Sequence, residues 1–111
     1  MHLKFKQKQN TLIVSLIGEL DHHAANSIRV KIDEEMKKSY INNFILDCKG
    51  LKFMDSSGIG MIIGRYKKIK SLHGRFYATN LNPQVKRIFN VSGLNRIIDT
   101  YSDNKTALKH M

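Results

Sequence analysis

The feature that most constrains this chain is an amphipathic helix pattern that lies between two apolar strand patterns. Residues 12–17 form a β-branched run that ends at Gly18, and residues 44–48 form a second apolar run. Between them, apolar residues recur every three or four positions from Asp21, a candidate N-cap, to about Lys38. A strand, a helix and a strand in this order favour a crossover between parallel strands. The sequence therefore predicts an α/β fold.

The remaining patterns predict the order of the other elements. These are a strand over residues 3–6 that turns at Asn10, a helix from Ser56 to His73 with Gly74 as its C-cap, a strand over 75–80, a helix from Pro83 to Gly93, a strand over 96–101, and a short helix that Ser102 caps. The predicted order is ββαβαβαβα, a mixed and mostly parallel sheet covered by about four helices. No segment has the composition of a linker, so we expect residues 1–111 to form one domain.

The composition limits the possible compartments and partners. The chain has no apolar run of about 18 residues and no apolar stretch at its start, so we expect a cytoplasmic protein without a membrane span. Cys48 is the only cysteine, which excludes an internal disulfide and suggests a buried thiol. The formal net charge of +10 leaves open a basic nucleic-acid-binding domain. The lysines are scattered, however, which favours solvated faces or a field that attracts an acidic protein.

One junction between a predicted strand and a predicted helix carries candidate chemistry, the string Asp55-Ser56-Ser57-Gly58. All four residues suit a turn or an N-cap, so they could do no more than start the helix. A phosphate on Ser56 would add about −1.5 to −2 charges at the positive end of the helix dipole. Such a change would alter the surface without unfolding the domain. Asp55 would repel this phosphate, and it could also orient the hydroxyl or serve as the cap.

Glycines in the helix that follows form a second candidate feature. Gly58, Gly60 and Gly64 each cost about 0.8–1 kcal/mol relative to alanine inside a helix. Gly60 and Gly64 are four residues apart and share one face. The close approach of another backbone, either a partner's helix or an internal strand, would explain this face.

Four segments together resemble the anti-sigma factor antagonists, the single-domain branch of the STAS (sulfate-transporter and anti-sigma-antagonist) fold. They are Gly18-Glu19-Leu20-Asp21, Phe53-Met54-Asp55-Ser56-Ser57-Gly58-Ile59-Gly60, Gly64-Arg65-Tyr66-Lys67, and the run from Pro83 to Phe89. They occur in the family's order along nearly the whole chain. This sequence has Ile59 where the family often has leucine, and its charge is more positive than expected for the family.

The resemblance implies a regulatory cycle. Such a protein binds an anti-sigma factor that is also a serine kinase, with ATP or ADP bound, and thereby frees a sporulation sigma factor. The kinase then phosphorylates the serine that follows the aspartate, here Ser56, and a metal-dependent serine phosphatase reverses the change. The matching partner-binding residues are Glu19, Asp21, Asp55, Ser56, Ser57 and Gly58, to which the glycine face adds Gly60. The loop near Asn80–Pro83 is a further candidate.

Other chemistries find less support in the sequence. His22 and His23 are adjacent and would diverge on a helix, so we expect no metal site. A hydrolase with Ser56 as nucleophile lacks a partner, because His73 would lie about 25 Å down the helix at about 1.5 Å per residue. We therefore expect no enzyme activity and no cofactor, and a monomer when the protein is free. The three function classes that remain are a phosphorylation-switched protein-binding module, a nucleic-acid-binding domain and a small hydrolase.

Overall fold

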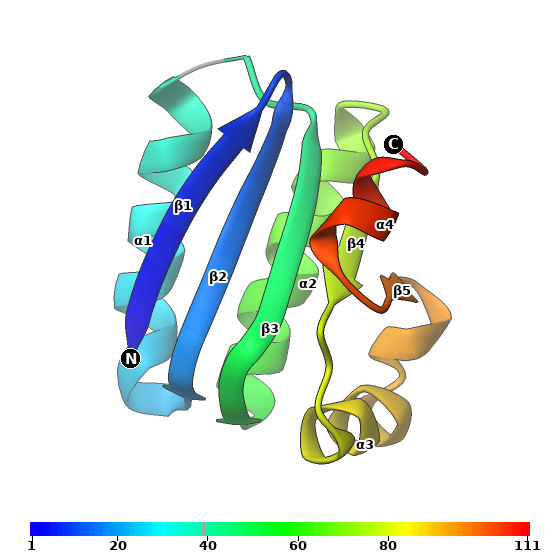
Figure 1. Cartoon of the computed structure of the whole chain (residues 1–111). Helices are drawn as coiled ribbons and strands as arrows, with labels where there is room; N and C mark the ends of the chain where they lie inside the picture. The colour runs from blue at the N-terminus through cyan, green and yellow to red at the C-terminus, as the bar shows by residue number, and fades with distance from the viewer. Residues whose placement is uncertain (39) are drawn as a thin grey trace.

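The computed structural model describes residues 1–38 and 40–111, which form one five-stranded sheet with helices on both faces (Figure 1). The elements are β1 (His2–Lys8), β2 (Thr11–Leu20), α1 (His22–Lys38), β3 (Asn43–Met54), α2 (Ser56–Ser71), β4 (Phe76–Thr79), α3 (Pro83–Ser92), the 3-10 helix η1 (Leu94–Arg96), β5 (Asp99–Tyr101) and α4 (Asn104–Leu108). This order confirms the predicted ββαβαβαβα arrangement.

The strands lie in the sheet in their order along the chain, β1-β2-β3-β4-β5. The hairpin pair β1 and β2 is antiparallel, and the pairs β2–β3, β3–β4 and β4–β5 are parallel. The predicted mixed and mostly parallel sheet is therefore confirmed. Each parallel pair needs a crossover, which α1, α2 and α3 with η1 supply.

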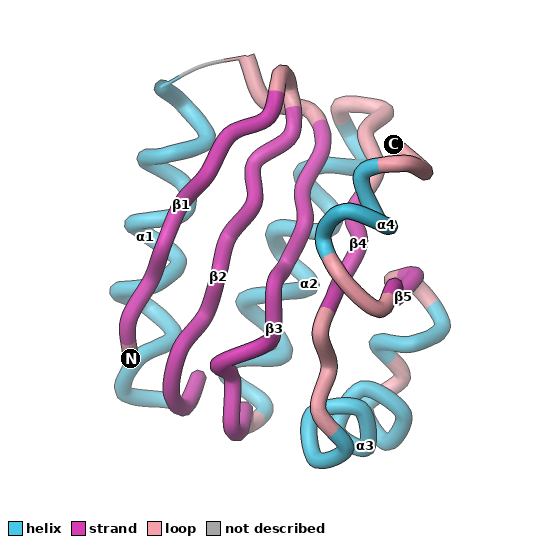
Figure 2. Tube along the Cα trace, viewed as in Figure 1, coloured by secondary structure: helices cyan, strands magenta, loops and turns pink. Residues whose placement is uncertain are grey.

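The helices divide between the two faces of the sheet (Figure 2). The main core lies beneath α1, α2 and α3, where the fully buried side chains of Ile32, Ile62 and Phe89 meet those of the sheet. The short helix α4 covers the opposite face through Ala107, which packs with buried residues of β2, β3 and β4. Because α1 follows β2 and α2 follows β3, the starts of both helices lie at the end of the sheet where β2 and β3 stop.

The structure corrects the predicted length of β3. This strand continues from Cys48 to Met54, because β2 runs beside it as far as Leu20 with two register shifts. Leu51 and Met54 are buried in the main core, although the exposed residues Lys52 and Phe53 separate them. The sequence pattern did not reveal this segment as strand.

Three predicted helix and strand boundaries are also wrong. Residues 96–98 are not in a strand, because the turn after Gly93 forms η1 and turns Ile98 inward. Asp103, not Ser102, caps α4, since its carboxylate accepts a hydrogen bond from the backbone N–H of Thr106. At the end of α2 the left-handed residue is His73, with φ of 59°, and not Gly74. Gly74 is needed for another reason, because a Cβ there would collide with the carbonyl group of Asn42.

Candidate functional site

Ser56 is the first residue of α2 and lies directly at the end of β3, exposed to solvent. Within the described residues no hydrogen bond engages its hydroxyl group. The side chain is therefore open to another protein, as a phosphate acceptor must be.

Asp55 is the N-cap of α2 and also connects this helix to the start of α1. Its Oδ1 accepts hydrogen bonds from the backbone N–H groups of Ser57 and Gly58, at 2.9 and 3.1 Å. Its Oδ2 accepts a third, from the backbone N–H of His22 at 2.8 Å. These bonds, the one from Gly58 foremost, hold the pKa of Asp55 below its usual value. The sequence left three roles open for Asp55: repelling a phosphate, orienting the Ser56 hydroxyl, and capping the helix. The hydrogen bonds show the capping role.

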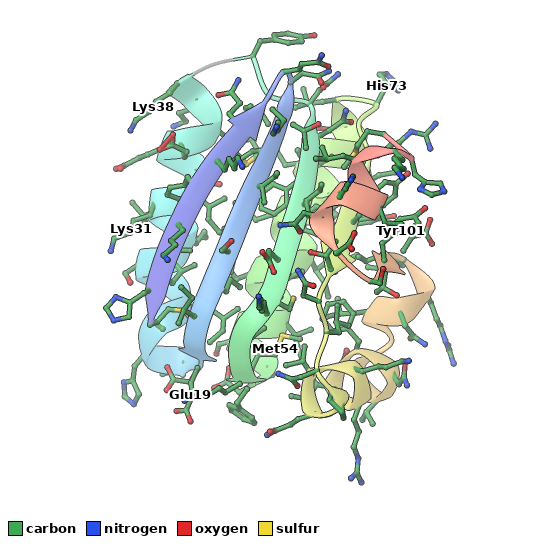
Figure 3. The ribbon with its side chains drawn as sticks, viewed as in Figure 1. Glu19, Lys31, Lys38, Met54, His73 and Tyr101 are labelled. Carbon is green, nitrogen blue, oxygen red and sulfur yellow. The ribbon has the colours of Figure 1, made fainter. Side chains whose placement is uncertain are left out.

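Asp21 caps the neighbouring helix in the same way, as predicted. Its Oδ1 accepts hydrogen bonds from the backbone N–H groups of His23 and Ala24, both at 3.0 Å. The two caps lie close together because β2 and β3 are parallel and end side by side, with Leu20 opposite Met54. Figure 3 shows the side chains of Glu19 and Met54 at this same end of the sheet.

Gly58 is buried where α2 crosses the end of β2. A Cβ at this position would collide with the carbonyl oxygen of Leu20 and approach its Cγ to 2.9 Å. Contact within the protein thus explains this glycine.

Gly60 and Gly64 differ from Gly58, because no atom of the described chain outside the adjoining turns of α2 would lie within 4 Å of a Cβ at either position. One of the two explanations offered for this glycine face, the close approach of an internal strand, is therefore wrong. Gly60 is exposed and forms part of the wall of a groove of about 360 Å³ between α1 and α2, which Ser57 also lines. The face remains open to a partner.

The two arginines that line this α1–α2 groove share a single carboxylate. Asp33 lies 3.2 Å from Nε of Arg65 and 3.5 Å from Nη1 of Arg29, so two guanidinium groups share one carboxylate. At the mouth of the groove, Nδ1 of His22 lies 3.2 Å from Oγ of Ser57. One carboxylate thus offsets the charge of one of the two guanidinium groups, and Nη1 of Arg65 is buried without a hydrogen-bond partner among the described residues.

A second groove, between α2 and α3, was not recognised in the sequence. It has a volume of about 340 Å³ and is lined by Ile59, Arg87, Ile88, Val91 and Ser92. Val91 is 82% exposed, so it takes almost no part in the core. The only signal in the sequence is that Val91 lies off the apolar face that Val85 and Phe89 define.

Most of the residues expected to bind a partner gather at one edge of the molecule. Exposed Glu19, half-buried Asp21 and the start of α2 meet where β2 and β3 end. The loop after β4 is divided: Asn82 bonds the carbonyl of Leu51 on this side, whereas Asn80 bonds Asp47 across the sheet.

The described residues hold neither a group of three metal-ligating side chains nor a helix long and apolar enough to cross a membrane. The pair His22–His23 accordingly has no third ligand among residues 1–38 and 40–111. The histidine rings themselves contact one another edge to face, with centroids 5.9 Å apart.

Residues 2–107 match the family described as STAS domain. The chain therefore belongs to the STAS domain family. It is 37% identical over 111 residues to the anti-sigma F factor antagonist of Paenibacillus polymyxa. The aligned region spans 100% of this chain and 95% of the relative.

Two solved structures extend the comparison. The anti-sigma factor antagonist SpoIIAA in its unphosphorylated form is similar with a TM-score of 0.83 and 31% identity, covering 98% of this chain and 95% of that one. The phosphorylated form of the Bacillus cell fate determinant SpoIIAA is similar with a TM-score of 0.75 and 29% identity, covering 99% and 100%. These relatives confirm the resemblance to the anti-sigma factor antagonists that the sequence suggested.

Proposed function

We propose that this protein is an anti-sigma factor antagonist that phosphorylation of Ser56 switches off. In its unmodified form it binds an anti-sigma factor that is a serine kinase carrying ATP or ADP, and so frees a sporulation sigma factor. A serine phosphatase restores the unmodified form. The observation that carries the proposal is the exposed Ser56 hydroxyl at the start of α2, beside a carboxylate that is held in place.

The chemistry of the switch belongs to the partner. Oγ of Ser56 attacks the γ-phosphorus of ATP, a new O–P bond forms, the bond to ADP breaks, and the hydroxyl proton passes to the kinase or to water. This chain supplies only the acceptor and is proposed to have no catalytic activity and no cofactor. The proposal needs no nucleic acid or membrane, places the protein in the cytoplasm with its partners, and treats the free protein as a monomer.

The cap explains why a phosphate would change the surface and not the fold. The N–H groups of Ser57 and Gly58 already bond Asp55, so they are not free to draw a phosphate onto the end of the helix. The phosphate, with about −1.5 to −2 charges, would stand in solvent beside the Asp55 carboxylate. It would therefore repel acidic groups of a partner docked at this edge. Glu19, Asp21, Ser57 and Gly60 are the other residues of the proposed contact region, while Gly58 supports α2 from beneath.

The test is incubation with the purified cognate anti-sigma kinase and ATP, followed by mass spectrometry of the peptides. We expect one phosphate, on Ser56. Ser56→Ala should bind the kinase and accept no phosphate, and Ser57→Ala, the matched neighbouring change, should still be phosphorylated. Labelling on Ser57, or no binding of the unmodified protein to the kinase, would contradict the proposal.

A further inference from the structure

The α1–α2 groove lies between two helices that pack beside one another on the same face of the sheet (Figure 1). Two arginines line it, Arg29 from α1 and Arg65 from α2. Among the described residues, Asp33 is the only carboxylate that pairs with either of them. One negative charge cannot neutralise two guanidinium groups, so this pair of arginines leaves a net positive charge at the groove.

Arg65 is the group that this arrangement leaves unsatisfied. Its side chain is only 14% exposed, and its Nε lies 3.2 Å from Asp33. Its Nη1, in contrast, is buried without a hydrogen-bond partner within residues 1–38 and 40–111. A buried donor on a charged group is costly when it lacks an acceptor, and buried polar groups of native proteins are hydrogen-bonded in the great majority of cases. We therefore expect Arg65 to bond an acceptor that the chain itself does not supply.

The walls of the groove suit a small molecule that carries such an acceptor. The volume of about 360 Å³ lies near the lower end of the range found for ligand pockets. No described residue that lines the groove carries a carboxylate, Ala25 and Met61 provide apolar wall, and Gly60 adds no side chain. Oδ1 of Asn26 accepts a hydrogen bond from Nη2 of Arg29 at 2.9 Å, which leaves the amide nitrogen of Asn26 as a further donor. Positive charge and free donors beside apolar wall are complementary to an anion on a small organic molecule.

We propose that the α1–α2 groove binds a small oxyanion, a phosphate or carboxylate group whose oxygens accept hydrogen bonds from Nη1 of Arg65 and from the guanidinium group of Arg29. Guanidinium groups bind both kinds of anion through paired N–H donors. Ser57 and His22, whose Oγ and Nδ1 lie 3.2 Å apart, also line the groove and would flank the ligand. This ligand site depends neither on the kinase nor on phosphorylation of Ser56.

The test is a titration of the ¹⁵N-labelled protein with sodium phosphate and, separately, with sodium acetate, followed by heteronuclear NMR at constant pH. Sodium chloride keeps the ionic strength constant, so the screening of surface charges does not change during the titration. We expect saturable shifts that concentrate on the residues of α1 and α2 that line the groove. The anion that binds more tightly identifies the ligand group as phosphate or carboxylate.

The decisive variant is Arg29→Gln, which removes one proposed donor from a side chain that is 44% exposed. We expect it to weaken anion binding about tenfold or more, as the loss of a hydrogen bond to a charged group does. The matched control is Arg96→Gln, the same change at an exposed arginine of η1 outside the groove, which should bind as the parent does. Gly60→Leu should abolish binding, because its side chain fills the groove. The thermal midpoint of each variant in chloride verifies its fold.

The absence of saturable shifts at the groove with both anions would overturn the site. An equal loss in Arg96→Gln would do so too, since it would indicate general attraction of anions to a basic protein. Unchanged affinity in a folded Arg29→Gln is a third contradicting result. Should Arg29→Gln not fold, Gly60→Leu decides the question, and binding by it as tight as that of the parent would overturn the inference. Because the kinase is absent from these titrations, none of these results bears on the proposed function, and failure of the kinase assay would leave the anion site standing.

Discussion

Two glycines two residues apart in α2 should respond in opposite ways to the same substitution. Gly60→Ala adds a methyl group that would meet no atom of the described chain within 4 Å outside the adjoining turns of α2. The position lies inside the helix, where alanine is favoured over glycine by about 0.8–1 kcal/mol. Gly58→Ala adds the same methyl group against the carbonyl oxygen and side chain of Leu20. Because the obstacle includes backbone, the strain should exceed the gain in helix propensity and destabilise the protein by about 1–3 kcal/mol.

The assay is thermal unfolding followed by circular dichroism at one fixed pH and protein concentration. For a domain of this length, about 1 kcal/mol corresponds to a change in midpoint of roughly 4 °C. We expect Gly60→Ala to raise the midpoint by about that amount and Gly58→Ala to lower it by at least as much. A lower midpoint for Gly60→Ala, or an unchanged one for Gly58→Ala, would refute the assignment of one glycine to open space and the other to close packing.

Three further outcomes are expected. Although burial of Asp47 opposes its ionisation, hydrogen bonds from Asn80 and Asn104 and from other donors hold its pKa below the usual value. The stability it contributes is present above its unfolded pKa, near about pH 4, and is lost as the pH falls through the folded value. Asp47→Asn should therefore flatten the acid limb of the stability curve in urea titrations; an unchanged limb would contradict this. Burial raises the pKa of the Cys48 thiol, so it should react with Ellman's reagent only after unfolding, and rapid labelling of the native protein would be inconsistent with the structure. Ser56→Asp should leave the thermal midpoint within about 2 °C while weakening binding to the kinase, and full affinity would argue against repulsion as the switch.

The fold class and the position of the site could be predicted from the sequence because they depend on local signals. The crossover between residues 12–17 and 44–48 needs only strand and helix periodicity, which neighbouring residues define. Asp21 and Asp55 are short acidic side chains at helix starts, and each accepts backbone N–H groups within three residues. Ser56 follows Asp55 directly, so its place at the start of α2 was determined by the same signal.

What the sequence could not show depends on which elements meet. The extension of β3 to Met54 depends on the neighbouring strand, and the third hydrogen bond of Asp55, from His22, depends on β2 and β3 ending together. The glycines of α2 look alike along the chain, yet only Gly58 has Leu20 against it. The α2–α3 groove is lined by residues of two successive helices that only the folded chain brings to the same hollow. Spatial neighbours decide these features, and a pattern read along a single chain carries no information about them.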